Sequence, residues 1–276
     1  VFFERGRQFV EDCEEQFLAP YARKSKDAHK TRLHGEMEDV HRTAFQRDRD
    51  RIIYSNSFRN LSDKRQILVE HDSERNRSRL THTVEVVQVS KTIAKSMGLN
   101  EDLTEAIALG HDLGHPPFGH TGEAILDALL NGEDTAEGTL PGDDFGGFKH
   151  NYQSLRVADI LEKKYEYEGL NLTSFVREGI LKHTSIRSER YRYPDIDTDK
   201  LHCDQFVSLT LEGQVAAIAD EIAQRTFDLE DALRAGYIRL KDVRDLKLVQ
   251  DVDRTCNIVH FYEQDPDEYI NFMISG

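Results

Sequence analysis

The sequence predicts an all-α fold, and three observations support the prediction. Apolar residues recur at helical spacing along most of the chain, and clear start and stop signals separate these segments. No internal repeat is visible, so a solenoid is not indicated. With 276 residues, 38% of them hydrophobic, the chain can bury a sizeable core. We expect a single domain over residues 1–276.

The first strong helix is predicted over residues 81–97. It carries a wide apolar stripe and ends at Gly98, a good stop signal. A second helix then begins after Asn100, a favourable N-cap, with Glu101 and Asp102 in its first turn. This second helix delivers a His-Asp pair, His111 and Asp112, at its C-terminal end.

Further helices follow the same periodicity. They are predicted over residues 121–130, 150–167, 172–183, 211–225 and 230–235. Residues 131–147 are rich in Gly, Asp and Thr and predict a mobile loop. Residues 184–208 are polar and aromatic, and we expect an extended loop that lies over the site. The Val-rich segment 249–259 is compatible with a strand or a helix.

Charge limits the classes of partner. The net charge of −15 argues against nonspecific binding of duplex DNA, which needs a basic face. Residues 42–79 nevertheless carry ten Arg or Lys against six acids, about +4 in all. This segment is either a solvated, salt-bridged helix face or a surface that attracts a polyphosphate.

Cysteine spacing and the N-terminus suggest a cytoplasmic protein. The three cysteines have no C-x-x-C spacing, so neither a zinc ribbon nor a disulfide framework is indicated. Glu4 stands too early for a signal peptide, and no apolar run approaches the length of a membrane span. We expect no membrane partner.

Four residues form a candidate metal site: His82, the adjacent pair His111 and Asp112, and Asp220. Two imidazoles and two carboxylates suit one divalent transition metal, with open positions for water or a phosphate oxygen. A lone His or His-Asp dipeptide is a weak signal. Residues 111–120, however, read HDLGHPPFGH. Burying three His and one Asp beside apolar residues is costly unless they are paired, so such a cluster is seldom present for structural reasons alone.

These residues also carry a family resemblance. The segments RLTHTVEV (79–86) and EDLTEAIALGHDLGHPPFGHTGE (101–123) resemble the HD-domain superfamily, and within it the dGTPase-like triphosphohydrolases. Further matches begin at residues 42 (RTAFQRDRDRI), 149 (KHN), 177 (REGILKH) and 218 (IADEIA). The resemblance runs collinearly over about residues 12–238. It implies an HD-type helical fold with a central metal site and a core over about 42–238. Because the family usually continues further, we expect its C-terminal part to be short or missing.

The resemblance also implies a reaction. His82, His111, Asp112 and Asp220 would hold one ion, with Mn, Mg, Fe and Co all compatible. Water would attack the α-phosphorus of a dNTP and release a 2′-deoxynucleoside and intact triphosphate. The implied catalytic residues are His115, His120, Glu123 and His150. His120 and Glu123 would form an acid/base pair, while His115 and His150 would contact the phosphate. His115 shares a helix face with His111 only if that helix persists so far.

Substrate contacts are predicted at five positions: Lys64, Gln66, Arg79, Gln224 and Asp228. Arg79 precedes His82 by three residues, so both lie on one helical face, from which Arg79 can point toward a metal-bound phosphate. By the resemblance, Gln66 matches a position that contacts the deoxyribose 3′-hydroxyl and the base, and Asp228 matches the acceptor for that 3′-hydroxyl. Gln224 replaces a Tyr that the family packs against the sugar C2′, which leaves base preference and ribonucleotide exclusion open.

Two alternatives remain beside the dNTP triphosphohydrolase. One is another HD phosphohydrolase, such as a nucleotidase or phosphodiesterase, and the other is a weakly active nucleotide-binding regulatory subunit. By resemblance we expect a homo-oligomer, hexameric or tetrameric, with dNTPs as allosteric effectors and single-stranded nucleic acid as a further candidate effector.

Overall fold

The computed structural model describes residues 6–26, 28–65, 78–136, 138, 143–186, 191–199, 201–259, 262 and 265–275. Over these residues the regular elements are all helical, apart from one isolated β-bridge between Arg65 and Ser78. The predicted all-α fold is therefore confirmed. The chain forms two compact units, residues 1–220 and 221–276, and each is described by itself.

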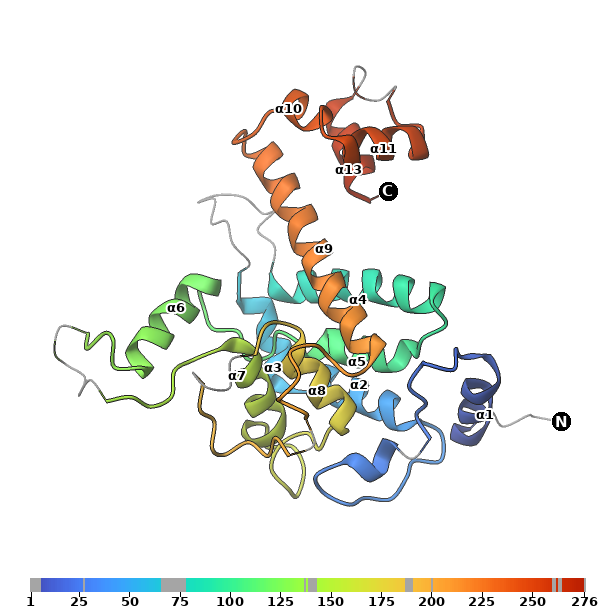
Figure 1. Cartoon of the computed structure of the whole chain (residues 1–276), viewed down its shortest axis with the longest axis vertical. Coiled ribbons are helices and arrows are strands. Elements are labelled where there is room, and N and C mark those ends of the chain that lie inside the picture. Colours follow the sequence, from blue (N-terminus) through green and yellow to red (C-terminus); the bar gives the residue numbers. More distant parts are fainter. Residues whose placement is uncertain are drawn as a thin grey trace. The chain divides into compact units, whose positions relative to one another are not determined.

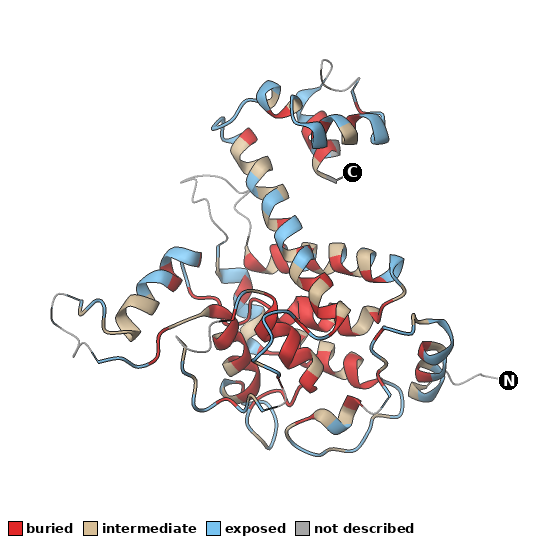
Figure 2. Cartoon of the chain, in the orientation of Figure 1, coloured by how far each residue is buried: buried red, intermediate tan, exposed pale blue. Residues whose placement is uncertain are grey.

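Helix α5 (Glu101–Gly110) is the centre of the first unit (Figure 1). It packs against α2 (Ala44–Ile53), α4 (Arg79–Ser96) and α8 (Ser174–Lys182). Most of its residues are buried, including Leu103, Ile107 and Leu109 (Figure 2). A helix buried on nearly all sides can hold polar groups at its end in a fixed position.

Local capping determines where α4 and α5 begin. The Asn100 side chain accepts a hydrogen bond from the backbone N–H of Leu103 at 3.1 Å, as predicted for an N-cap. The Ser78 hydroxyl accepts from the backbone N–H of Thr81 at 3.2 Å, so α4 starts two residues earlier than predicted.

Two glycines allow α5 and α8 to approach closely. A Cβ on Gly110 would lie 2.5 Å from Cδ1 of Ile180, and a Cβ on Gly179 would lie 2.5 Å from Cδ1 of Ile107. Both contacts are far below van der Waals distance, so a larger residue at either position would force the isoleucine side chain or the helix to shift. The close approach brings the C-terminal ends of α5 and α8 together.

The remaining elements of the first unit lie around this centre. They are α1 (Arg7–Phe17), η1 (Ala28–Thr31), α3 (Asn56–Arg59), η2 (Asn60–Asp63), α6 (Gly119–Leu130), α7 (His150–Arg156), the π-helical turn η3 (Val157–Leu161), and the first part of α9 (Leu211–Arg234).

Two predicted helix boundaries were wrong. The helix predicted over 150–167 ends at Leu161, because Glu162 turns to accept hydrogen bonds from the backbone and hydroxyl of Ser57. The helices predicted over 211–225 and 230–235 are one continuous helix, α9, since no residue between them blocks helical hydrogen bonding. The described parts of 131–147 and 184–208 contain no helix or strand, in agreement with the predicted loops.

The second unit is a small helical cluster. It contains the end of α9, α10 (Leu240–Arg244), α11 (Lys247–Cys256) and α13 (Pro266–Ser275). Its core gathers Leu233, Val243, Val249, Ile258, Tyr269, Ile270 and Met273. The Val-rich segment left open as strand or helix lies mostly in α11.

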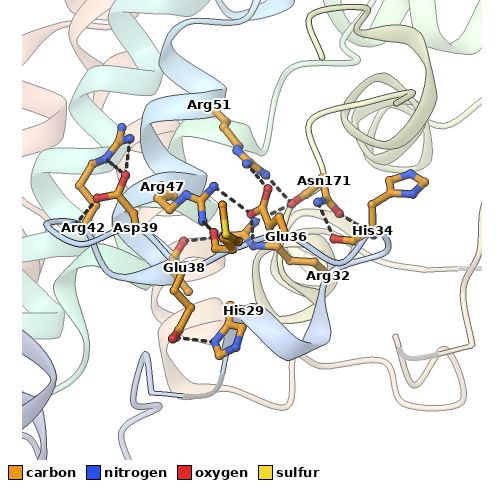
Figure 3. Close-up of polar contacts among 12 residues, drawn as sticks. His29, Arg32, His34, Glu36, Glu38, Asp39, Arg42, Arg47, Arg51 and Asn171 are labelled. Carbon is orange, nitrogen blue, oxygen red and sulfur yellow. Dashed lines mark hydrogen bonds and ion pairs between the residues drawn. The ribbon is translucent and has the colours of Figure 1, made fainter. Parts of the chain in front are cut away.

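A polar network ties the segment before α2 to the rest of the first unit (Figure 3). The Glu36 carboxylate accepts a hydrogen bond from Arg51 at 2.5 Å and forms ion pairs with Arg32 at 2.8 Å and Arg47 at 3.2 Å. Arg32 and Arg51 also donate to the backbone carbonyl of Asn171, close before α8. This network anchors α2, and through it α5.

Among the described residues, no helix is both long and apolar enough to span a membrane.

Candidate active site

The four predicted metal ligands come together from three helices. His82 lies on α4, His111 and Asp112 follow α5, and Asp220 lies on α9. Nε2 of His82 is 2.9 Å from Oδ1 of Asp220, and Nε2 of His111 is 3.6 Å from that same oxygen. Oδ1 of Asp112 is also 3.6 Å from Nε2 of His111. We call these four residues the metal group.

The donor chemistry of the metal group fits a divalent cation. Nδ1 of His111 lies 2.7 Å from the carbonyl oxygen of Ala108, so this nitrogen carries the proton and donates it. Nε2 therefore holds a lone pair, and it is buried with no hydrogen-bond partner among the described residues. An imidazole whose far nitrogen is fixed by a carbonyl is the usual arrangement for a metal-binding His.

Arg79 orients one of the carboxylates. Its Nη1 donates to Oδ2 of Asp112 at 2.5 Å, and both side chains are buried. This contact leaves Oδ1 of Asp112 facing His111. Arg79 therefore contacts a metal-group carboxylate, on the helical face that it shares with His82.

Neighbouring groups keep both metal-group carboxylates ionised. Burial by itself raises the pKa of Asp220, but the electrostatic interaction with His111 and the hydrogen bond with His82 lower it to about 2. Burial likewise opposes ionisation of Asp112, whose pKa is held well below its ordinary value by electrostatic interactions with His111 and Arg79. Ionised carboxylates are the form that binds a cation.

A second cluster lies beside the metal group. It consists of His115, His120, Glu123 and His150, whose potential ligand atoms lie within 4.8 Å of one another. These are the four predicted catalytic residues, and we call them the acid/base group.

Glu123 organises the acid/base group. Its Oε2 is 3.1 Å from Nδ1 of His120, and its Oε1 is 2.8 Å from Nδ1 of His150. Oε1 also accepts the backbone N–H of His150 at 2.9 Å and lies 3.3 Å from Nζ of Lys149. Burial opposes ionisation, but the hydrogen bonds from both histidines lower the pKa of Glu123 far below its usual range. The carboxylate is therefore ionised.

His120 and His115 differ in exposure. The His120 side chain is 60% exposed, so with Nδ1 held by Glu123 its Nε2 can reach substrate or water. His115 is buried and stacks on His150, with ring centroids 4.5 Å apart. Burial lowers the pKa of His115 to about 2, although the charge of Asp112 works against this, so its imidazole is neutral.

The turn after α5 places His115. Helix α5 ends at Gly110 and residues 111–114 form turns, so the helix does not persist to His115, and His115 does not share a helix face with His111. The backbone N–H of Gly114 instead donates to Oγ of Ser154 on α7 at 2.9 Å, and that hydroxyl donates to the carbonyl oxygen of His111 at 2.7 Å.

A tight Pro-Pro turn begins α6. Phe118 has a left-handed backbone with φ of 64°. A Cβ on Gly122 would lie only 2.0 Å from the carbonyl oxygen of Pro117, so glycine is required for this approach. The turn places His120 on the first turn of α6 and Glu123 one turn later.

His183 was not predicted as a site residue. It is the C-cap of α8, it is buried, and its ring meets that of His111 edge-on with centroids 5.2 Å apart. Its Nε2 is 3.1 Å from Nε2 of His150. Burial, reinforced by electrostatic interactions with His150 and His111, lowers the pKa of His183 to about 3. Its only signal in the sequence is its place at the end of the REGILKH match, residues 177–183.

The predicted substrate residues are only partly brought to the site. The carbonyl oxygen of Lys64 accepts the backbone N–H of Arg79 at 2.8 Å, and burial lowers the pKa of the Lys64 ammonium while the charge of Asp112 opposes this. Gln66 lies outside the described residues. Gln224 and Asp228 lie on α9 beyond Asp220, in the second unit.

Comparison with known proteins identifies the family of this chain. The model of the HD domain family matches residues 79–225, which include all four members of the metal group. The chain belongs to the HD domain family.

Several curated proteins of one name are similar to this chain over most of its length. The chain is 47% identical over 255 residues to a deoxyguanosinetriphosphate triphosphohydrolase-like protein of Syntrophus aciditrophicus (strain SB), covering 91% of this chain and 59% of the relative. Proteins of the same name match at 45% in Thiobacillus denitrificans (strain ATCC 25259 / T1), covering 85% of this chain and 58% of the relative. The chain thus spans somewhat under two thirds of the length of these relatives.

Proposed function

We propose that this chain carries the active site of a metal-dependent dNTP triphosphohydrolase. One observation carries the proposal: the metal group and the acid/base group adjoin, because ligand atoms of Asp112, His150 and His183 lie within 4.8 Å of one another. A phosphoryl group held at the metal group would therefore sit beside a His-Glu pair that can transfer protons. The printed names of the relatives support a deoxynucleoside triphosphate as substrate.

The metal group supplies the electrophilic part of the reaction. A divalent ion held by His82, His111, Asp112 and Asp220 would polarise a phosphoryl oxygen and lower the pKa of a coordinated water. The mixed nitrogen and oxygen donors are compatible with Mn, Mg, Fe or Co. Arg79 holds Asp112 in the orientation that leaves one oxygen for the ion.

The acid/base group supplies the proton transfers. In the proposed reaction, the oxygen of water bonds to the α-phosphorus while the bond from phosphorus to the 5′-oxygen breaks, giving a 2′-deoxynucleoside and triphosphate. The 5′-oxygen must gain a proton and the attacking water must lose one. Nε2 of His120 is the exposed nitrogen that can exchange these protons, and Glu123 holds the ring at Nδ1.

Cationic side chains favour a polyphosphate substrate. Arg79 and Lys64 meet at the start of α4 beside Asp112, and they would offset part of the negative charge of a bound triphosphate. Assembly into a homo-oligomer and regulation by dNTPs or single-stranded nucleic acid belong to the same proposal, and they rest on the family resemblance alone.

Product analysis tests the proposal. Purified protein would be incubated with manganese and each dNTP, with GTP and with dNTP mixtures, and the products separated by anion exchange. Variants His111→Ala and Asp112→Ala should lose activity, while His41→Ala, at an exposed position outside both groups, should keep it.

The products distinguish the alternatives. Deoxynucleoside with intact triphosphate, lost in the two metal-group variants, would support the proposal, and GTP turnover would report whether Gln224 admits a ribose. Orthophosphate or pyrophosphate would indicate another HD phosphohydrolase. Saturable dNTP binding without turnover would indicate a regulatory subunit.

A further inference from the structure

Two helices that carry metal-group residues begin at one place. His111 and Asp112 directly follow the C-terminal end of α5, and Asp220 lies farther along α9. The backbone N–H of Asn100, the N-cap of α5, donates to Oε1 of Glu212 at 3.1 Å. Glu212 is the second residue of α9. One hydrogen bond therefore joins the start of α5 to the start of α9.

The Glu212 side chain also holds a third segment. The residue is fully buried, and the same Oε1 accepts the backbone N–H of Arg23 at 2.9 Å. Its Oε2 is buried with no hydrogen-bond partner among the described residues. Burying a carboxyl group with one unpaired oxygen costs free energy, and the two hydrogen bonds at Oε1 offset part of this cost. Glu212 thus ties α9 both to the segment after α1 and to the start of α5.

Asn100 is itself fixed on every side. While its backbone N–H serves Glu212, its side-chain oxygen accepts the backbone N–H of Leu103 at 3.1 Å. Its side-chain Nδ2 donates to Oε1 of Glu14 at 3.0 Å. The other oxygen of Glu14 accepts the backbone N–H and the hydroxyl of Ser25, at 2.6 and 2.7 Å. The atom that Glu212 contacts therefore has a well-defined position.

The apolar face of α9 does not lock its position as firmly. Its buried apolar residues ahead of Asp220 are Val215 and two alanines, Ala216 and Ala219. Small side chains form shallow ridges, which resist sliding of one helix on another less than large ones do. A slip of one residue would move Asp220 by about 1.5 Å along the helix axis and rotate it by about 100°. Metal–ligand distances are held within about 0.2 Å, so such a slip would remove Asp220 from the metal group.

We propose that Glu212 is a positioning residue for the metal group. Its hydrogen bond to the start of α5 sets the axial position and rotation of α9, and so brings Asp220 within reach of His82 and His111. Glu212 lies eight residues before Asp220, about 12 Å along the helix, so it acts through Asp220 and not on the ion. Both of its donors are neutral backbone N–H groups, so an amide oxygen with the same reach can replace the carboxylate oxygen.

Manganese affinity tests this role without turnover. Metal-free protein would be titrated with Mn²⁺, and the unbound ion would be measured by electron paramagnetic resonance. Glu212→Asp keeps the charge but shortens the side chain by one methylene, and Glu212→Ala removes the acceptor. Both should raise the Kd for Mn²⁺ by about 10- to 100-fold, the usual effect of losing a group that orients metal ligands. Glu212→Gln keeps the reach and should bind Mn²⁺ nearly as tightly as the unaltered protein.

Glu162→Ala is the matched control for a loss of stability. Glu162 is also a buried glutamate, and one of its oxygens accepts two hydrogen bonds, from the backbone N–H and the hydroxyl of Ser57, at 2.7 and 2.6 Å. These contacts tie the segment after η3 to α3, and neither carries a metal-group residue. The variant should unfold at lower urea concentration and keep its Kd for Mn²⁺. A Glu212 with only a structural role would behave in the same way.

This inference deepens the proposed function and rests on it for the composition of the metal group. An unchanged Kd in folded Glu212→Asp or folded Glu212→Ala would overturn it, as would an equal rise in Glu212→Gln or Glu162→Ala. If Glu212→Ala does not fold, Glu212→Asp decides the question.

The outcomes also separate this inference from the proposed function. The expected pattern of affinities in a protein that hydrolyses no dNTP would leave the inference standing and refute the proposed function. Hydrolysis by a protein whose Mn²⁺ affinity does not depend on Glu212 would do the reverse. Failure of the unaltered protein to bind Mn²⁺ would overturn both.

Discussion

Gly114 donates its backbone N–H to Oγ of Ser154, and the backbone of Ser154 also occupies the space where a side chain at position 114 would lie. A Cβ at position 114 would lie 2.1 Å from the backbone nitrogen of Ser154. The turn that carries His115 therefore lies directly against helix α7, which carries His150.

Gly114→Ala should destabilise the protein and displace His115. Backbone atoms of α7 cannot yield as a flexible side chain could, so we expect a loss of about 1–3 kcal/mol in the free energy of unfolding. Urea unfolding would measure it. Gly35→Ala is the control, because nothing lies within 4 Å of a Cβ at that position. Equal stability of the two variants would show that the close approach is not required.

Manganese should raise the melting temperature of the unaltered protein. An ion that binds only the folded state stabilises it by about 2.7 kcal/mol at one hundred times its dissociation constant. In His111→Ala the shift should be lost, because Nε2 of His111 faces both carboxylates of the metal group. Differential scanning calorimetry with and without manganese would test this, with His41→Ala as the control. A full shift in His111→Ala would place the ion elsewhere.

His120→Gln and Glu123→Gln should lower kcat by about 10²- to 10⁴-fold, the usual contribution of general acid–base catalysis. Neither residue is in the metal group, so metal content should be unchanged. Initial rates with saturating dNTP and elemental analysis would be measured together. Activity within twofold of the unaltered protein would remove this pair from the proposed mechanism.

Glu36→Gln should cost about 1–3 kcal/mol of stability, because the variant leaves three arginines beside an uncharged amide. Burial opposes ionisation of Glu36, but the hydrogen bond from Arg51 and the charges of Arg32, Arg51 and Arg47 lower its pKa. The stabilisation is therefore present above the ordinary pKa of a glutamate and is lost as the pH falls through the folded-state value.

Urea unfolding over a pH series would follow this effect. The stability difference between Glu36→Gln and the unaltered protein should be largest near pH 7 and shrink in acid. Glu15→Gln, at an exposed position on α1, is the control. A difference that does not change with pH would show that Glu36 acts through packing alone.

The sequence predicted the site best where the determinants are local. The Asn100 cap and the length of α5 place His111 and Asp112 at a helix end, and no distant contact is needed for that prediction. The end of helical structure at Leu161 depends instead on Ser57, which is 105 residues away from Glu162 in sequence. Such a contact leaves no periodic pattern in the sequence.

His183 was missed for a related reason. It stands alone at the end of a helix, where a histidine commonly has a structural role, and its significance arises from the packing of α8 on α5. The glycines that allow this packing, Gly110 and Gly179, resemble ordinary small core residues in the sequence. Only the three-dimensional approach shows that they bring His183 between His111 and His150.

The Ser154 hydroxyl links the metal group to the helix that carries His150. It accepts from Gly114 and donates to the carbonyl of His111, and it lies one turn along α7 from His150. A shift of α7 would therefore move the metal group and the acid/base group together. The two groups are coupled through one hydroxyl, so a substitution that displaces one of them is expected to displace the other as well.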